Sequence, residues 1–370
     1  MKTQAAVLWD YGQDWKIEEL ELDDPRNDEV LVRLAASGLC HSDEHVRVGD
    51  MPFDALPVIG GHEGAGVVEK VGPLVTDVKE GDHVVLSFVP ACGRCEYCAK
   101  GYQSLCDQGA GIAVGLQGDG TSRHHVGGRD ARLMCMLGTF SPYTVVRESS
   151  VVTIDQDIPL DKAALVGCAV TTGWGTAINA AKVSAGETVA VMGVGGVGAN
   201  AVQGAKMAGA SRVVAIDPSE FNRDQARRFG ATHTYASVDE AREALTDLTR
   251  GKMADAALIT VGVVHGEMIG EALSLVGKLG RVALTSLGSD TEDDVKMSMF
   301  EVTAYRKTII GTLFGNANPR SDIPKLLEFY SRGELLIDEL ITRTYSLDQI
   351  NQGYDDMREH RNVRGMILFD

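Results

Sequence analysis

Four of the seven cysteines in this chain lie within fifteen residues, in the stretch CGRCEYCAKGYQSLC. They are Cys92, Cys95, Cys98 and Cys106, and their spacing is C-x2-C-x2-C-x7-C. An iron–sulfur run would place the fourth cysteine closer and follow it with proline, whereas four thiolates in a turn-rich loop can enclose a tetrahedral zinc ion. Such a site leaves no coordination position open. The spacing therefore predicts a structural zinc site that performs no chemistry itself.

A glycine-rich turn, GVGGVG at 193–198, is the second pattern with chemical meaning. Gly193, Gly195 and Gly198 fit G-x-G-x-x-G, with an apolar run before them and an alanine-rich segment after them. The backbone here, including Gly196 and Val197, would approach a pyrophosphate at a helix N-terminus. Asp217 follows 19 positions after the last glycine and would bind the adenosine ribose, which favours NAD over NADP. A turn required only by packing is the alternative.

The segments around these motifs predict two different architectures. Apolar runs at 188–192, 212–216, 254–262, 281–288 and 308–315 alternate with helical segments such as 221–231 and 266–280, a pattern typical of a doubly wound parallel sheet. The first 165 residues instead contain short strands with glycine-rich turns, which indicates a separate β-domain. The tail contains a helical segment at 321–333 and a final strand, VRGMILFD.

Composition excludes several classes of partner. The chain has 370 residues, 44% of them hydrophobic, which suits about two globular domains. Its 35 basic and 52 acidic residues give a net charge of −17, so a nucleic-acid partner is not expected. It has no apolar run of about 18 residues and no signal-peptide pattern at its start, so we expect no membrane span and a cytoplasmic protein with reduced thiols.

Two further stretches contain residues that can bind metal. SGLCHSDEH supplies Cys40, His41, Ser42 and His45, and GGHEGAGVV supplies His62 beside Glu63. Taken alone, each stretch is a weak signal, because a lone cysteine or histidine in a glycine-rich turn is more often structural than a ligand.

Six motifs occur together in a fixed order: GLCHSDEH, GHEGAGVVEKVG, CGRCEYCAKGYQSLC, DGTSR, GCAVTTGWG and GVGGVG. This set resembles the zinc-containing medium-chain alcohol dehydrogenases from end to end. Within that family the chain is most similar to the actinobacterial nicotinoprotein alcohol dehydrogenases, which use nitrosodimethylaniline as an artificial acceptor. The resemblance implies a GroES-like catalytic domain formed by residues 1–169 and 314–370. It also implies a Rossmann NAD-binding domain at 170–313, with the active site in the cleft between the two.

The resemblance also implies the catalytic residues. Cys40, His62 and Cys168 would hold a catalytic zinc with one position left open, and Glu63 would be its acidic neighbour. Zinc would acidify the alcohol, hydride would pass to NAD, and the product would be an aldehyde or ketone. Ser42 and a solvent-facing His45 would carry the proton away, with the cofactor ribose between them.

For the cofactor, the family pattern implies three further residues. His41 replaces an arginine common at a phosphate-facing position, Arg364 matches a second phosphate contact, and Thr172 matches a residue that packs on the nicotinamide. Phe88, Met51 and Leu116 map to positions that line the substrate pocket. Each subunit is expected to bind two zinc ions. The protein is expected to be a homo-oligomer, a dimer or a tetramer, whose substrate is a small alcohol or aldehyde.

Two alternatives remain open on the sequence. A formaldehyde dehydrogenase that acts on a glutathione or mycothiol adduct would need cationic groups at its pocket, for which Arg47, Arg123 and Arg129 are candidates. A non-catalytic NAD-binding protein is the other, although it would have no need of an open metal site. Cys135 matches none of the motifs.

Overall fold

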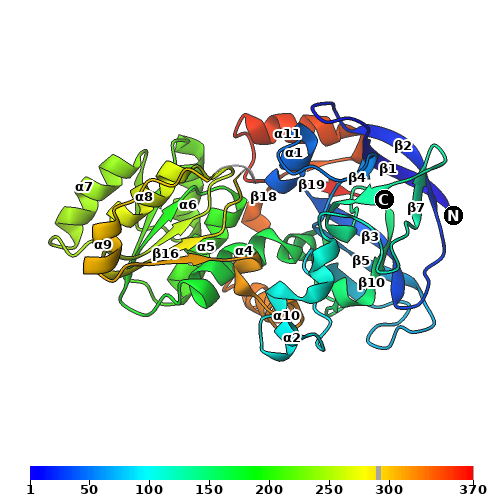
Figure 1. The fold of residues 1–370 in the computed structure, drawn as a ribbon, viewed down its shortest axis with the longest axis horizontal. Coiled ribbons are helices and arrows are strands. Elements are labelled where there is room, and N and C mark those ends of the chain that lie inside the picture. Colours follow the sequence, from blue (N-terminus) through cyan, green and yellow to red (C-terminus); the bar gives the residue numbers. More distant parts are fainter. Residues whose placement is uncertain (289–292, 370) are drawn as a thin grey trace. The chain divides into compact units, whose positions relative to one another are not determined.

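The computed structural model describes residues 1–288 and 293–369, and Figure 1 shows its course. The chain divides into two compact units. The first unit contains residues 1–168 and the tail from Asn318, and the second contains Ala169–Ala317. No helix in the described part of the chain is both long enough and apolar enough to cross a membrane.

The described residues of the first unit form two sheets. One has the order β8-β7-β2-β1-β4-β9 and the other the order β11-β6-β5-β3-β19-β18, with β10 also paired to β3. The strands are β1 (Lys2–Leu8), β2 (Lys16–Leu22), β3 (Glu29–Gly38), β4 (Val58–Ile59), β5 (Gly64–Val71), β6 (His83–Leu86), β7 (His124–Val126), β8 (Arg129–Asp130), β9 (Arg132–Leu133), β10 (Tyr143–Arg147), β11 (Val151–Thr153), β18 (Ile341–Tyr345) and β19 (Arg364–Leu368).

Strand β3 organises this unit because three other strands pair with it. Strand β5 lies along one edge, and β10 and β19 share the other, with β19 opposite Ala36–Gly38. Strand β3 is ten residues long and almost wholly buried, as expected of a strand that is paired on both edges. The C-terminal tail therefore completes the first unit and brings the start of β19 beside the end of β3.

The described residues of the first unit also form α-helices. They are α1 (His41–Val48), α2 (Glu96–Ala99), α3 (Leu160–Ala163), α10 (Pro319–Ser331) and α11 (Ile350–Arg358). Figure 1 shows α1 beside α11, and Arg358 of α11 donates to Glu44 of α1 at 2.8 Å. Gly353 of α11 also lets Leu39, just before α1, pack closely, since a Cβ at position 353 would lie 2.3 Å from Leu39 Cδ1. The turn that begins α1 is therefore held from the tail of the chain.

The second unit contains one all-parallel sheet in the order β14-β13-β12-β15-β16-β17. In chain order this is the doubly wound arrangement of dinucleotide-binding folds, so the predicted fold class is confirmed. The strands are β12 (Thr188–Met192), β13 (Arg212–Ile216), β14 (His233–Tyr235), β15 (Ala254–Ile259), β16 (Val276–Leu284) and β17 (Thr308–Gly311). The helices are α4 (Ala169–Gly175), α5 (Gly196–Met207), α6 (Glu220–Phe229), α7 (Val238–Leu248), α8 (Gly266–Leu275) and α9 (Met299–Ala304).

Some predicted boundaries were wrong. The helix expected at 266–280 ends at Leu275, and its last residues belong to β16. Gly277 and Gly280 explain this, because glycine disfavours a helix interior and the chain here can pair with β15 instead. The final strand is β19, shorter than VRGMILFD, and residue 370 lies outside the described residues.

Candidate metal and cofactor sites

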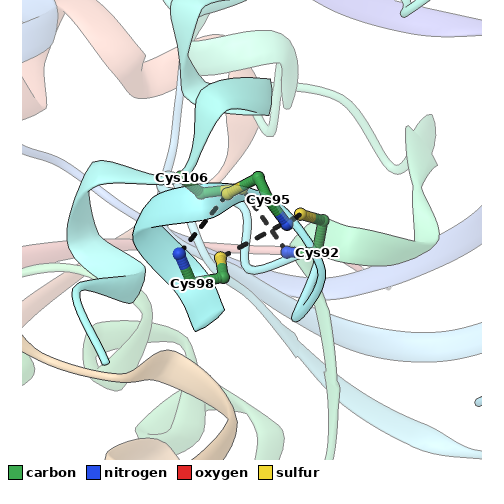
Figure 2. Close-up of side chains that lie close together, drawn as sticks. All are labelled: Cys92, Cys95, Cys98 and Cys106. Carbon is green, nitrogen blue, oxygen red and sulfur yellow. Dashed lines mark hydrogen bonds between the residues drawn. The ribbon is translucent and has the colours of Figure 1, made fainter. Parts of the chain in front are cut away.

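The four-cysteine lobe, residues 92–106, brings its four thiols together as predicted. Their sulfur atoms all lie within 4.8 Å of one another, with 4.0 Å between Cys92 and Cys98 and 3.9 Å between Cys95 and Cys106. Figure 2 shows the four side chains close together. Four ligands at about 2.3 Å from one zinc ion would be about 3.8 Å apart, so the lobe fits tetrahedral zinc.

Backbone N–H groups of the same loop point at these sulfurs. Cys95 donates to Cys92 Sγ at 3.3 Å, and Cys98 and Asp107 donate to Cys95 Sγ at 3.4 and 3.5 Å. Such bonds lower the pKa of Cys95 to about 7, whereas burial raises that of Cys98 to about 12. A bound cation is what would keep all four thiols ionised together.

A second cluster joins residues that are distant in sequence: Cys40, His62, Glu63 and Cys168. Each offers one ligand atom, and these atoms all lie within 4.8 Å of one another. Cys40 ends the turn after β3 and precedes α1, His62 and Glu63 lie in the turn before β5, and Cys168 is the last residue of the first unit before α4. The structure therefore brings together all three predicted ligands and their acidic neighbour.

Asp43 completes this cluster, and our sequence analysis missed it. Its Oδ2 lies 3.1 Å from His62 Nδ1, and its Oδ1 accepts a hydrogen bond from the Gly61 N–H at 2.8 Å. Burial would lower the pKa of His62, but Asp43 and the Cys40 thiolate raise it well above its ordinary value. Because Asp43 lies beside Nδ1, Nε2 is the ring nitrogen left for a metal. The sequence spacing could have indicated that Asp43 is buried, because Asp43 lies three residues, about one helical turn, before buried Val46 on the same face of α1.

Glu63 is held by Arg364. The Arg364 Nη2 donates to Glu63 Oε2 at 2.5 Å and to the Leu39 carbonyl at 2.8 Å. Burial raises the pKa of Glu63 to about 7, although Arg364 acts to lower it. Glu63 Oε1 is buried and has no hydrogen-bond partner among the described residues, which fits a site that expects a cation. Arg364 was expected at a cofactor phosphate; the structure places it on Glu63, and the phosphate contact stays a prediction.

The predicted relay residues, Ser42 and His45, lie in α1, and Ser42 Oγ is 3.8 Å from Cys40 Sγ. His41, which was expected at a cofactor phosphate, is exposed at the start of the helix. His45 is buried rather than solvent-facing as expected, and its Nδ1 lies 2.9 Å from Asp50 Oδ2.

The glycine turn lies in the second unit, between β12 and α5. Gly193 has φ +81°, and a Cβ there would lie 2.7 Å from Val261 Cα; a Cβ on Gly198 would lie 2.0 Å from the Gly193 carbonyl oxygen. A Cβ on Gly195 would meet no atom within 4 Å, so the backbone is open to a ligand at that position. Helix α5 begins at Gly196 without a side-chain cap, which leaves the N–H groups of its first turn for an anion.

Asp217 follows β13 and is tied to the glycine turn. Its Oδ2 accepts from the Val194 N–H at 2.8 Å, and its Oδ1 accepts from the Ser219 N–H at 2.9 Å. Asn222 of α6, which our sequence analysis also missed, donates to both oxygens at 3.2 Å. Thr172 lies buried in α4, and its Oγ1 has no partner within the described residues. The turn, Asp217 and Thr172 thus all belong to the second unit.

Comparisons with known proteins agree with this geometry. Residues 26–156 match the family model "Alcohol dehydrogenase GroES-like domain", and residues 196–332 match "Zinc-binding dehydrogenase". Over 368 residues the chain is 51% identical to the NDMA-dependent alcohol dehydrogenase of Amycolatopsis methanolica, with 100% of this chain and 99% of that protein covered. It is 50% identical to the putative alcohol dehydrogenase D of Mycobacterium tuberculosis over the full length of both.

Solved structures give the same result. The benzyl alcohol dehydrogenase of Acinetobacter calcoaceticus superposes with a TM-score of 0.93 at 31% identity, covering 100% of both chains. An alcohol dehydrogenase zinc-binding domain protein from Burkholderia ambifaria has a TM-score of 0.94 at 32% identity, covering 100% of this chain and 99% of that one.

Proposed function

Because the chain belongs to the zinc-containing medium-chain alcohol dehydrogenase family, we propose that it oxidises a primary or secondary alcohol and retains NAD through turnover. The observation that carries this proposal is the donor set of partly buried Cys40 with buried His62 and Cys168, with Asp43 behind the histidine. Three protein ligands leave a position for substrate, as catalytic zinc sites require. When bound, zinc polarises the alcohol oxygen and NAD accepts the hydride.

Within this proposal the chain's own residues bind, orient and move a proton. The first-turn N–H groups of α5 hold the pyrophosphate, and Asp217 binds the adenosine ribose. Asp43 fixes the orientation of His62, and Arg364 balances the charge of Glu63. Ser42 takes the alcohol proton and passes it towards His45.

An aromatic side chain, Phe88, lies beside His62 of the metal cluster. The Phe88 ring lies edge-on to the His62 ring, with centroids 5.8 Å apart and an interplanar angle of 79°. Phe88 and Met51 also pack against the same buried hydrophobic cluster. Likeness to a benzyl alcohol dehydrogenase supports an aryl or alkyl alcohol as the substrate.

Retention of NAD rests on the 51% identity to an NDMA-dependent enzyme. If NAD stays bound, the hydride must leave to a second substrate, so we expect ping-pong kinetics with nitrosodimethylaniline. The test is extensive gel filtration, followed by assay of benzyl alcohol and nitrosodimethylaniline with no added cofactor. Turnover is expected. Dependence on added NAD⁺ with release of NADH would show an exchanging cofactor, and no alcohol oxidation under either condition would refute the proposed activity.

The thiol-adduct alternative gains no support from its candidate cations. Arg123 is fully buried and binds Glu29 through two bonds of 2.8 and 2.7 Å. Arg47 binds Glu44 through two bonds of 2.8 and 2.7 Å, and Arg129 lies over the Trp9 ring. Activity that appears only with added mycothiol or glutathione would restore this alternative. A non-catalytic NAD-binding protein would have no use for an open metal site formed by Cys40, His62 and Cys168.

We also propose that the enzyme is a homo-oligomer. Strand β17 is the end strand of its sheet, and apolar side chains lie exposed on and near it, among them Phe300 at 72% and Ile309 at 38%. An unpaired strand edge with apolar neighbours favours association with a second copy. Light scattering after size exclusion should give a multiple of 39.6 kDa, and Phe300→Asp should lower that mass. A monomeric wild type would contradict this assignment.

A further inference from the structure

One carboxylate beside the predicted proton relay belongs to neither metal site. Asp50 Oδ2 lies 2.9 Å from His45 Nδ1. The His45 side chain is 9% exposed, whereas that of Asp50 is 47% exposed. The histidine is therefore largely covered, and Asp50 is the half-exposed group in contact with it.

The backbone after α1 brings Asp50 back to this ring. The helix ends at Val48, and Gly49 after it has a φ of +91°, which L side chains rarely adopt. The His45 carbonyl oxygen then accepts three backbone hydrogen bonds, from the N–H groups of Gly49 at 3.1 Å, Asp50 at 2.9 Å and Met51 at 3.2 Å. The chain thus reverses over the last turn of α1 and returns the Asp50 side chain to the residue five positions earlier.

Contacts on either side hold this reversal in place. The Tyr11 hydroxyl accepts the Phe53 N–H at 2.7 Å and lies 3.2 Å from the Phe53 carbonyl oxygen. The charged neighbours on α1, Glu44 and Arg47, bind each other. The pairing of His45 with Asp50 is therefore a built feature of the α1 C-terminus.

Building on the proposed function, we infer that Asp50 is a positioning residue of the proton relay. A hydrogen bond from Nδ1–H to the carboxylate selects the neutral tautomer of His45 that has its lone pair on Nε2. The ring takes the relay proton on Nε2 and becomes imidazolium, and the ionised Asp50 stabilises that charge. The ring returns to neutral by releasing one proton to water, so that one proton passes through the ring and none is transferred to Asp50.

The chain offers a matched control. His125 Nδ1 lies 2.8 Å from Asp130 Oδ1, the same contact at the same spacing, on the β7–β8 hairpin. Asp50→Asn should lower kcat on the order of tenfold, as expected for loss of one charge-assisted hydrogen bond, with the alcohol KM within about twofold. Asp130→Asn should leave both unchanged, and Asp50→Glu should recover part of kcat. In the His45→Gln background, Asp50→Asn should cause no further loss, because it acts through the ring.

A second readout does not depend on activity. The nitrogen-15 shifts of the His45 ring, assigned by their absence in His45→Gln, should show the Nδ1–H tautomer in the wild type when the ring is neutral. Asparagine can donate to Nδ1, so Asp50→Asn should shift the ring towards Nε2–H, a change that loss of structure alone would not produce.

Three results would overturn the inference. The first is an Asp50→Asn variant with the same kcat as the wild type, and the second is an Asp50→Asn substitution that lowers kcat as much in the His45→Gln background as in the wild type. The third is a neutral His45 ring in the wild type that carries its proton on Nε2. A wild type without alcohol oxidation would instead refute the proposed function, and the ring shifts would still decide whether Asp50 holds Nδ1.

Discussion

The two cysteine sites of this protein use the same side chain in opposite ways. In the four-cysteine lobe, ligands within fifteen residues receive hydrogen bonds from their own loop. In the second cluster, Cys40 and Cys168 join His62, and the surrounding charges come from Asp43 and from Arg364 in the tail. A local loop can close around an ion by itself. In this protein the ligands of the second cluster come instead from distant parts of the chain, and other elements hold them in place.

The largest expected effect lies at the open site. Cys40→Ser should reduce kcat/KM by on the order of a thousandfold or more, because the metal contributes several kcal/mol of charge stabilisation. The variant should remain folded, since β3, β5 and β19 pair without this thiol. Steady-state kinetics, circular dichroism and zinc analysis by mass spectrometry would test this. A variant that unfolds would make both sites structural and remove the contrast.

At the closed site the loss should appear in stability. Cys95→Ser removes one of four thiolates that together constrain the lobe, so we expect one zinc equivalent to be lost and Tm to fall by about 10 °C, as for a loss of several kcal/mol. Differential scanning calorimetry on matched Cys95→Ser and Cys40→Ser samples compares the two sites directly. Equal Tm values for the two variants would contradict the assignment of different roles.

The same contrast explains what could be predicted from sequence. The four-cysteine lobe and the glycine turn were predictable from spacing, because their residues are neighbours in the chain. The second cluster was expected only through family resemblance, since Arg364 and Glu63 meet across 301 positions. Asp43, Asn222 and Asp50 were missed because their roles depend on which face of a helix is buried or on how a chain reverses. The prediction that His45 faces solvent was wrong for the same reason.

The carboxylate behind the open site should have an intermediate effect. Asp43→Asn keeps the size of the side chain but removes the charge that orients His62, and loss of such a partner costs about 10- to 100-fold in metal affinity or activity. Zinc titration of the apo-protein and kcat/KM measure the two quantities. Glu44→Gln, at the adjacent position, is the control and should stay near wild type. Equal losses in the two variants would show a general effect of charge on α1.

The smallest effect is expected for the seventh cysteine, which tests whether burial alone makes a thiol a ligand. Cys135 is as buried as Cys98, but it packs in the hydrophobic cluster with Leu39 and Phe140 and belongs to neither metal group. Burial raises its pKa to about 12, so the thiol stays protonated in neutral solution. Cys135→Ala should therefore keep two zinc equivalents and a kcat within about twofold of wild type, with a stability loss of about 1 kcal/mol from packing. Zinc analysis beside chemical denaturation would show whether a metal is lost. Loss of either equivalent would mean that Cys135 supports a metal site, and the division between a closed local site and an open distant one would then be incomplete.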